Sequence, residues 1–357
     1  MTLDKIREED IRNISKSIYK FSERIEGRTF LITGGSGFIG QYLVQTLSFL
    51  NKNGLRRRCR IISVDNHITS SDAHTRLAKG SDVKCMNVDV NKPFKIKGGV
   101  DYIIHAAGIA SPVYYGKFPL ETIDTAVYGT RNMLDLTNQK KVKSFIFFSS
   151  SEIYGDPSPD SIPTKETYHG NVSSIGSRAC YDESKRLGET LCMTYFNLFK
   201  TPIKIVRPFN VFGPGMNYKD HRVIPSIIYR ALNNKDLLIH MNGLQTRTFC
   251  YVSDAIIAFF KVLFSEENGQ VYNVGNGKNE ISMNNLARLI GKILSKKIVT
   301  KNIPYPKNYP EDEPRRRCPD INKIKRKLNY SPRVDLEEGL TRTIAWCEQF
   351  WNASVNE

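Results

Sequence analysis

Long apolar runs are missing from this sequence of 357 residues. Its most apolar stretches, Phe145–Phe148 and Ala255–Phe264, are far shorter than the roughly 18–20 residues of a membrane-spanning helix. The first residues also lack the apolar core of a secretory signal. We therefore expect a cytoplasmic protein that does not insert into a membrane.

Paired cysteines are also missing. The seven cysteines are odd in number and scattered, and none forms a C-x-x-C pair, while the six histidines lack metal-ligand spacing. This pattern argues against a zinc site or a disulfide framework and favours reduced thiols. We expect no bound metal.

Acidic residues are the scarcer charge, with 36 Asp and Glu against 52 Lys and Arg, which gives a net charge of +16. This excess favours an anionic ligand such as a nucleic acid, a membrane surface or a phosphorylated small molecule, or it is a solvated basic surface. Because the sequence has no basic and aromatic stacking platform and no recognised nucleic-acid module, we expect no nucleic-acid partner.

Residues 1–27 form an extension with one apolar helical stripe. Apolar residues recur there at spacings of three and four, at Ile11, Ile14, Ile18, Phe21 and Ile25. We expect a helix that packs on its own domain or on a dimer mate. A membrane-surface helix fits less well, because the polar face mixes acidic with basic residues.

Strands alternate with helices after Gly27. The expected strands are Arg28–Thr33, Cys59–Val64, Val83–Val88, Val100–His105, Lys143–Ser149 and Ile203–Val206, with helices near Pro119–Asn138 and Tyr181–Phe199. This alternation predicts an α/β fold, a doubly wound parallel sheet covered by helices on both faces, over residues 28–206.

Beyond Arg207 the alternation becomes irregular. We expect helices Ile224–Leu232 and Met283–Ile293, strands Leu237–His240, Phe249–Val252 and Val271–Val274, and a loop Pro304–Pro314. Residues 207–357 are therefore predicted to form a smaller α+β, substrate-binding region. The chain is expected to return to the first domain near residues 240–275, leaving a cleft between the two regions.

A glycine motif lies directly between the first strand and its helix, with Gly34, Gly37 and Gly40 in the sequence TGGSGFIG. Such glycines allow a tight turn, close approach to a pyrophosphate and close helix packing. Asp65 ends the second strand, where a carboxylate accepts hydrogen bonds from ribose hydroxyls and repels a 2′-phosphate. This set predicts a Rossmann-type domain that binds NAD rather than NADP; a purely structural turn is the alternative.

Tyr181 and Lys185 form a Y-x-x-x-K pair early in a predicted helix, on one helix face. A nearby ammonium favours the phenolate form of a tyrosine, which can remove a hydroxyl proton while hydride leaves the same carbon. Such pairs are common on protein surfaces, but this one comes after the strand Lys143–Ser149, whose carboxyl end leads into Ser149–Glu152. Ligands of open α/β sheets bind at that end of the strands.

Together these motifs resemble the extended short-chain dehydrogenase/reductase family, in its nucleotide-sugar epimerase/dehydratase branch, over nearly all of residues 28–350. Further matching segments are His105–Gly108, Ser149–Gly155, Arg207–Pro214, Gln245–Val252 and Tyr272–Asn276. Within the branch the sequence is most similar to the UDP-glucuronate decarboxylases, through Glu152–Pro157, Arg178–Arg186 and Glu313–Ile321.

The resemblance implies a set of residues that bind NAD. They are Gly34, Gly37, Phe38, Ile39, Gly40, Asp65, Asn66, Asp89, Val90, Ala106, Ala107, Gly108, Ser149, Tyr181 and Lys185. It also implies that Asn210 and Arg222 contact the diphosphate of a nucleotide sugar, and that Arg317 grips its phosphates or ribose. A homodimer through helices near 119–138 and 181–199, and a place in polysaccharide biosynthesis, are implied as well.

The resemblance further implies a catalytic cycle. Tyr181 takes the proton of the sugar 4-hydroxyl while hydride passes to NAD⁺, Lys185 tunes Tyr181, and Ser150 binds the 4-oxygen. A C6 carboxylate is then part of a β-keto acid, which loses CO2. Ser151 and Glu152 would flank that carboxylate, Arg247 would assist protonation or grip a phosphate, and the hydride would return.

Four positions depart from the decarboxylase pattern, namely Ser177, Val172–Ser174, Gly215 and Ala126. The first three lie in substrate-side loops, which leaves the sugar and the nucleotide base open. A nucleotide-sugar 4,6-dehydratase or 4-epimerase is therefore the alternative function, although Glu152 is unusual for a 4-epimerase. A non-catalytic NAD-binding scaffold is a remote alternative, because such proteins typically lose the tyrosine–lysine pair or the serine.

Overall fold

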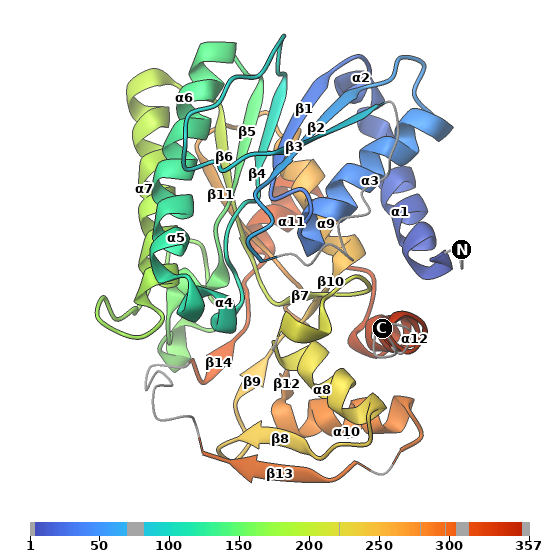
Figure 1. Ribbon diagram of the computed structural model, residues 1–357. Helices are drawn as coiled ribbons and strands as arrows, with labels where there is room; N and C mark the ends of the chain where they lie inside the picture. The colour runs from blue at the N-terminus through green and yellow to red at the C-terminus, as the bar shows by residue number, and fades with distance from the viewer. Residues whose placement is uncertain are drawn as a thin grey trace.

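The computed structural model describes residues 4–69, 82–220, 222–278, 280–296, 298–304 and 314–351. Its centre is a seven-stranded parallel sheet with the order β11-β6-β5-β4-β1-β2-β3 (Figure 1). The strands are β1 (Thr29–Thr33), β2 (Arg60–Asp65), β3 (Val83–Asn87), β4 (Tyr102–His105), β5 (Ser144–Phe148), β6 (Ile203–Pro208) and β11 (Gln270–Val274). The predicted doubly wound Rossmann-type fold is confirmed. The strand order reverses between β1 and β4, because β2 and β3 follow on one side of β1 and β4, β5 and β6 on the other. Ligands of such sheets bind at this switch point.

Helices cover both faces of this sheet (Figure 1). One face carries α1 (Lys5–Ile18), α3 (Phe38–Asn53) and α9 (Val252–Leu263), and the other carries α4 (Pro112–Lys117), α5 (Pro119–Asp124), α6 (Thr130–Lys140) and α7 (Ala179–Phe199). The strands alternate their side chains between two cores, because Ile32 and Ile104 pack with the first group while Leu31 and Ile103 pack with the second. The inner strands of the sheet are thus buried on both faces, as expected for a parallel sheet, whereas the edge strand β3 is partly exposed.

The amino-terminal helical segment packs on its own chain. It consists of α1, a 3₁₀ turn (Tyr19–Phe21) and α2 (Ser22–Ile25). Ile11, Ile14, Ile18 and Ile25 are buried in the same core as α3 and α9. The apolar stripe is therefore satisfied within one molecule.

Two expected elements differ from the structure. The helix expected near Pro119–Asn138 is α5 and α6 joined by a π-helical turn (Thr125–Gly129), where a side chain on Gly129 would lie 2.9 Å from Val90 Cγ2. The strand expected at Phe249–Val252 is only Cys250–Tyr251, and Val252 begins α9. That part of the prediction is wrong, because Val252 and the apolar residues after it form the buried helix α9.

The remaining elements form three small sheets and several helices. They are β7 (Val211–Phe212), α8 (Val223–Leu232), β8 (Leu237–His240), β9 (Thr246–Arg247), β10 (Cys250–Tyr251), β12 (Ile281–Ser282), α10 (Met283–Ile293), β13 (Thr300–Ile303), β14 (Arg316–Arg317), α11 (Asn322–Leu328) and α12 (Leu336–Phe350). The expected loop Pro304–Pro314 lies outside the described residues except at its two ends. The domain boundary at residue 206 stays a prediction.

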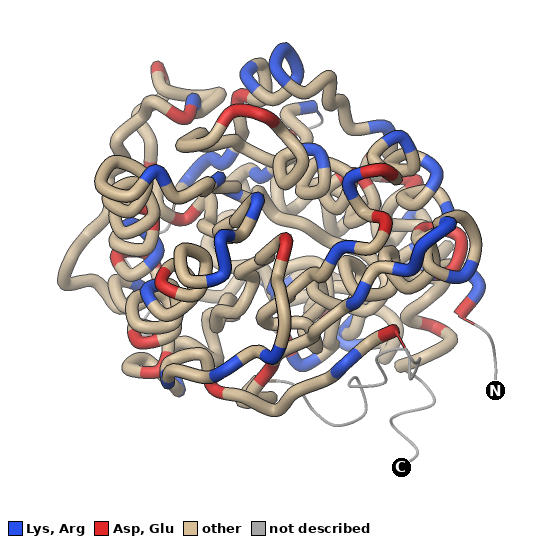
Figure 2. Tube along the Cα trace, turned by 90° about the horizontal axis from the view of Figure 1, so that it is seen from above, with Lys and Arg blue, Asp and Glu red and all other residues tan. Residues whose placement is uncertain are grey.

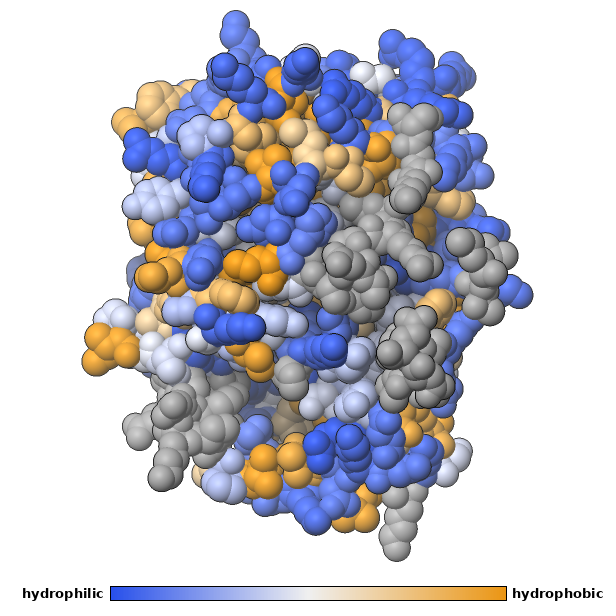
Figure 3. Space-filling view, in the orientation of Figure 1, coloured by the Kyte–Doolittle hydropathy of each residue, from blue (hydrophilic) through white to orange (hydrophobic). Residues whose placement is uncertain are grey.

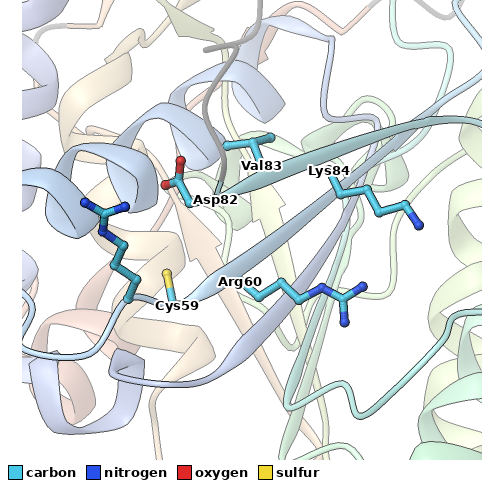
Figure 4. A pocket seen from close by; sticks show the side chains of 6 residues that line it. Cys59, Arg60, Asp82, Val83 and Lys84 are labelled. Carbon is cyan, nitrogen blue, oxygen red and sulfur yellow. The ribbon is translucent and has the colours of Figure 1, made fainter.

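The surface mixes the two signs of charge. Basic and acidic residues are interspersed along the chain (Figure 2), and the face in Figure 3 is mostly hydrophilic with scattered apolar groups. A pocket of about 330 Å³ lies at the amino ends of β2 and β3, lined by Arg58, Cys59, Arg60, Asp82, Val83 and Lys84 (Figure 4). Because ligands of parallel sheets bind at the carboxyl ends of the strands, this pocket is not the candidate site.

No helix in the described part of the chain has the length and apolar character needed to span a membrane. Over the same residues, no group of three or more His, Cys, Asp and Glu side chains is arranged to hold a metal ion. All seven cysteines are free thiols.

Candidate active site

The glycine motif forms the turn from β1 into α3. A side chain on Gly34, whose φ is +69°, would lie 2.8 Å from the Ala106 carbonyl oxygen, and one on Gly40 would lie 2.1 Å from the Gly34 oxygen. Both positions therefore require glycine. Gly37 is the N-cap of α3, so the first turn of that helix, including Phe38 and Ile39, presents N–H groups that have no partner within the helix.

Asp65, at the carboxyl end of β2, braces this turn. Its Oδ2 accepts the Ser36 N–H at 3.0 Å, and its Oδ1 accepts the His67 N–H at 2.9 Å. The next residue, Asn66, accepts the Ile68 N–H at 3.2 Å. The structure thus gives Asp65 a role in loop geometry that the sequence did not predict.

The ends of β3 and β4 complete the cofactor side. Asp89 accepts the Asn91 N–H at 3.0 Å, and Val90 packs against the π-helical turn. The Ala107 N–H donates to Thr33 Oγ1 at 3.3 Å, and a side chain on Gly108 would lie 3.0 Å from Lys185 Nζ. The segment Ala106–Gly108 therefore lies between the glycine turn and Lys185.

His105 is fully buried between two threonines. Its Nδ1 lies 2.7 Å from Thr33 Oγ1 and its Nε2 lies 3.2 Å from Thr130 Oγ1. Burial lowers the pKa of His105 to about 3, so the ring is neutral at pH 7. These contacts make it a structural residue.

Tyr181 and Lys185 lie in the first turns of α7, and both are about 5% exposed. Lys185 Nζ is 6.0 Å from the Tyr181 ring centroid and donates to the Phe148 carbonyl oxygen at 2.7 Å. The Tyr115 ring stacks on Tyr181 with centroids 5.3 Å apart. The pair is thus held at the carboxyl end of β5, as the sequence predicts.

The electrostatics of this pair differ from the sequence-based expectation. Burial raises the pKa of Tyr181 to about 12, against the lowering effects of its hydrogen bond with Ser150 and of the Arg222 charge. Burial also lowers the pKa of Lys185 to about 8. The expected depression of the tyrosine pKa is therefore wrong for the protein alone, because burial outweighs the nearby positive charge.

Glu152 lies in a 3₁₀ turn (Ser151–Tyr154) directly after β5, and its N–H donates to Ser150 Oγ at 3.2 Å. Its Oε2 contacts the guanidinium groups of Arg178 and Arg317. Both arginines are about 7% exposed. Arg178 is a site residue that was not predicted from the sequence, although its position about one helical turn before Tyr181 was a usable signal.

Arg247 and Arg317 lie opposite each other on the paired strands β9 and β14. Arg247 donates to the carbonyl oxygens of Thr246 at 2.8 Å and Arg315 at 3.4 Å. Arg317, to which the resemblance gave the phosphates or ribose, contacts Glu152 at 2.5 Å. The geometry thus places Arg317 beside Glu152, and its role toward a ligand stays a prediction.

Two further predicted substrate residues lie at the same edge. Asn210 has a positive φ of 39° and donates to the Thr248 carbonyl oxygen at 2.8 Å. Arg222 pairs with Asp220 and interacts electrostatically with Tyr181. Among the described residues, Ser149 Oγ, Arg222 Nε and Arg317 Nε are buried without hydrogen-bond partners. Such groups are typical of a site that binds a polar ligand.

Comparison with known proteins shows to which family the chain belongs. Residues 30–275 match the model of the NAD dependent epimerase/dehydratase family. The chain belongs to this family.

Two relatives show how far the likeness extends. A UDP-glucuronic acid decarboxylase 5 from Arabidopsis thaliana is 40% identical over 87% of this chain and 86% of its own. A UDP-glucuronic acid decarboxylase 1 from Xenopus tropicalis is 36% identical over 94% of this chain and 77% of its own. The resemblance found in the sequence is therefore confirmed across most of the chain.

Solved structures of the family share the fold. A UDP-glucuronic acid 4-epimerase from Bacillus cereus, in complex with UDP-glucuronic acid and NAD, is 27% identical, with a TM-score of 0.74 over 90% of this chain and 99% of its own. A dTDP-glucose 4,6-dehydratase from Streptomyces venezuelae, with NAD bound, has a TM-score of 0.78 at 21% identity over 91% of this chain and 98% of its own.

The cofactor side of this epimerase/dehydratase family member fits NAD. The glycine turn leaves no space for side chains at Gly34 and Gly40, the first N–H groups of α3 have no partner within the helix, and Asp65 lies beside the turn. This is the combination that binds a pyrophosphate and a ribose. NAD is thus the cofactor of the protein.

Proposed function

We propose that the protein converts UDP-glucuronate to UDP-xylose by decarboxylation. The observation that carries this proposal is the contact of Glu152 with two buried arginines, Arg178 and Arg317, next to the Tyr181 and Ser150 side chains. A site of this kind offers positive charge to an anionic sugar carboxylate. The 40% identity to a plant UDP-glucuronic acid decarboxylase supports the same reaction.

The first step is oxidation at C4 of the sugar. Tyr181 accepts the proton of the 4-hydroxyl, and Ser150, which is hydrogen-bonded to Tyr181, holds the 4-oxygen. The Lys185 ammonium lies on the same helix face and stabilises the phenolate that the step needs. NAD, when bound, takes up the C4 hydride and later returns it, so the reaction is redox-neutral overall.

The second step is loss of CO2. With C4 oxidised, the C6 carboxylate belongs to a β-keto acid, so the C5–C6 bond breaks and its electron pair forms an enolate over C5 and C4. A proton then adds at C5. We assign the carboxylate end of the site to Glu152, Ser151, Arg178 and Arg317, because Glu152 contacts both arginines and Ser151 precedes it in the turn after β5. Asn210, Arg222 and Arg247 are assigned to the nucleotide diphosphate.

A 4-epimerase is the second candidate, because a UDP-glucuronic acid 4-epimerase is among the structural neighbours. Both reactions, and a 4,6-dehydration, begin with oxidation at C4. They differ in the steps after this oxidation, and the presence of Glu152 with its arginines favours loss of the carboxylate.

Mass spectrometry of the protein incubated with UDP-glucuronate and NAD⁺ tests the proposal. We expect a product lighter by one CO2, absent with Tyr181→Phe and present with Tyr195→Phe. Tyr195 is a matched control, because it lies on the same helix but bonds Asp135 at 2.6 Å, away from the site. A product of unchanged mass that is a C4 epimer, loss of water from another nucleotide sugar, or unchanged substrate with NAD-loaded protein would contradict decarboxylation.

We also infer a cytoplasmic homodimer that supplies sugar donors for polysaccharide biosynthesis. Apolar side chains are exposed along the α5–α7 side, namely Leu120, Ile123, Tyr128, Leu187, Leu198 and Phe199. Sedimentation equilibrium should give the dimer mass for the native protein and the monomer mass for Leu198→Asp. The control Leu238→Asp, exposed on β8, should remain dimeric.

A further inference from the structure

Arg7, in the first turn of α1, reaches from the amino-terminal helix to the helix that follows the glycine turn. Its Nη2 donates to Gln41 Oε1 at 3.2 Å and to Gln45 Oε1 at 3.1 Å. Its guanidinium also lies over the Tyr42 ring, 5.2 Å from the centroid. The Arg7 side chain is only 14% exposed. It therefore contacts three residues of α3.

Gln41 connects this contact to the glycine turn between β1 and α3. Its Nε2 donates to the Ser36 carbonyl oxygen at 2.8 Å. Because the Gln41 Oε1 accepts from Arg7, the amide orientation is fixed, and its NH2 group must point at Ser36. The Ser36 N–H is bound in turn by Asp65 Oδ2 at 3.0 Å. Ser36 is thus held from both sides, by an acid of β2 and by an amide that Arg7 orients.

The helix that carries Arg7 is itself fixed. The buried Asp10 accepts from Tyr251 Oη at 2.7 Å and from Arg342 Nη2 at 2.8 Å. Asp4 accepts the Arg7 N–H at 3.1 Å and the Trp346 Nε1–H at 2.9 Å. These bonds join α1 to β10 and α12, so Arg7 approaches α3 from a defined direction.

We propose that Arg7 is a positioning residue for NAD binding, which holds the pyrophosphate-binding turn in place through Gln41. The amino-terminal helix is then part of the cofactor site, although it contributes no residue to the glycine motif. The inference rests on the NAD dependence of the family and not on the proposed substrate.

Titration of the full-length protein with NAD⁺ tests the role of Arg7. We expect Arg7→Ala to raise the dissociation constant about tenfold, since the hydrogen bond that it removes is charge-assisted. The kcat at saturating NAD⁺ should change less than about twofold, because no catalytic group is moved. Arg7→Lys should restore part of the affinity. Arg12→Ala is the matched control, because Arg12 is exposed on the same helix.

The two glutamines separate positioning from general stability. Both accept from Arg7, but only Gln41 also bonds Ser36. Gln41→Ala should therefore weaken NAD⁺ binding as much as Arg7→Ala, and the double variant should be no worse than either. Gln45→Ala should bind like the native protein. Native affinity in Arg7→Ala, or equal losses in Gln41→Ala and Gln45→Ala that follow the melting temperature, would overturn the proposal.

Discussion

The cofactor side and the substrate side of the active site are assembled in different ways. On the cofactor side, the main groups sit at the ends of neighbouring strands and are followed by a helix or turn, as with Gly34 after β1 and Asp65 as the last residue of β2. On the substrate side, Glu152 meets Arg317 across 165 positions of the chain. Local sequence therefore specifies the first side, whereas the second depends on where distant strands pair.

The largest effect should come from the cofactor side, at a single glycine. A side chain on Gly40 would lie 2.1 Å from the Gly34 oxygen, whereas one on Gly37 would lie 3.2 Å from it. Gly40→Ala should yield protein that neither folds normally nor binds NAD, while Gly37→Ala should fold with weakened binding. Circular dichroism and NAD⁺ titration check both. Normal binding by Gly40→Ala would show that the turn is less tightly packed than described.

A smaller but still severe effect is expected on the substrate side. Arg317 contacts Glu152, and Arg247 is its neighbour across the strand pair. Arg317→Ala should lower kcat for CO2 release about 100-fold, because it removes the charge beside the carboxylate end. Arg247→Ala should mainly raise KM for the nucleotide sugar. The reverse pattern would assign the carboxylate role to Arg247 instead of Arg317.

A moderate effect is expected for Asp65→Asn. An asparagine keeps the shape but loses the charge and one of the two acceptors for the Ser36 and His67 N–H groups. We expect NAD⁺ binding to weaken roughly tenfold, as for loss of a charge-assisted hydrogen bond, and the preference over NADP⁺ to shrink. Parallel titrations with the two cofactors measure this. An unchanged ratio of the two affinities would argue that Asp65 only braces the turn.

A pH dependence is the last expected effect, and it needs no substitution. Because burial raises the pKa of Tyr181 to about 12, its phenolate fraction grows with pH, and kcat/KM should rise between about pH 6 and 8. The rise should end near pH 8, because burial lowers the pKa of Lys185 to about 8 and its charge is then lost. Lys185→Arg should extend the rise. A flat profile would mean that proton transfer to Tyr181 does not limit the reaction.

The same contrast explains what the sequence could predict. The glycine turn, Asp65, Tyr181, Lys185 and Glu152 all follow a strand or begin a helix, so periodicity and spacing place them correctly. Their roles toward NAD and substrate stay predictions. The pairing of Glu152 with Arg317 could not be foreseen, because it depends on the register of β14 against β9.

Two other features could not be predicted from local sequence patterns, namely the start of α9 and the contact of Arg7 with α3. Val252 begins a helix although its neighbours favour a strand, because the apolar residues after it are buried with a helical period. The contact of Arg7 with Gln41 requires two helices to meet across 34 positions of the chain. Such contacts depend on tertiary packing, and the residues next to Arg7 or Gln41 in the sequence give no sign of it.

The first helix of the fold bonds to the last one, through Asp4 with Trp346 and Asp10 with Arg342. During synthesis the ribosome makes α1 more than 300 residues before these partners, and α9, on which it also packs, appears in between. The part of α1 that packs on α9 and the carboxylate of Asp10 must wait for them, although α3, the other neighbour of α1, is made much earlier. Folding of the nascent chain is therefore completed late, because the partners of α1 that lie nearest the end of the chain are made last.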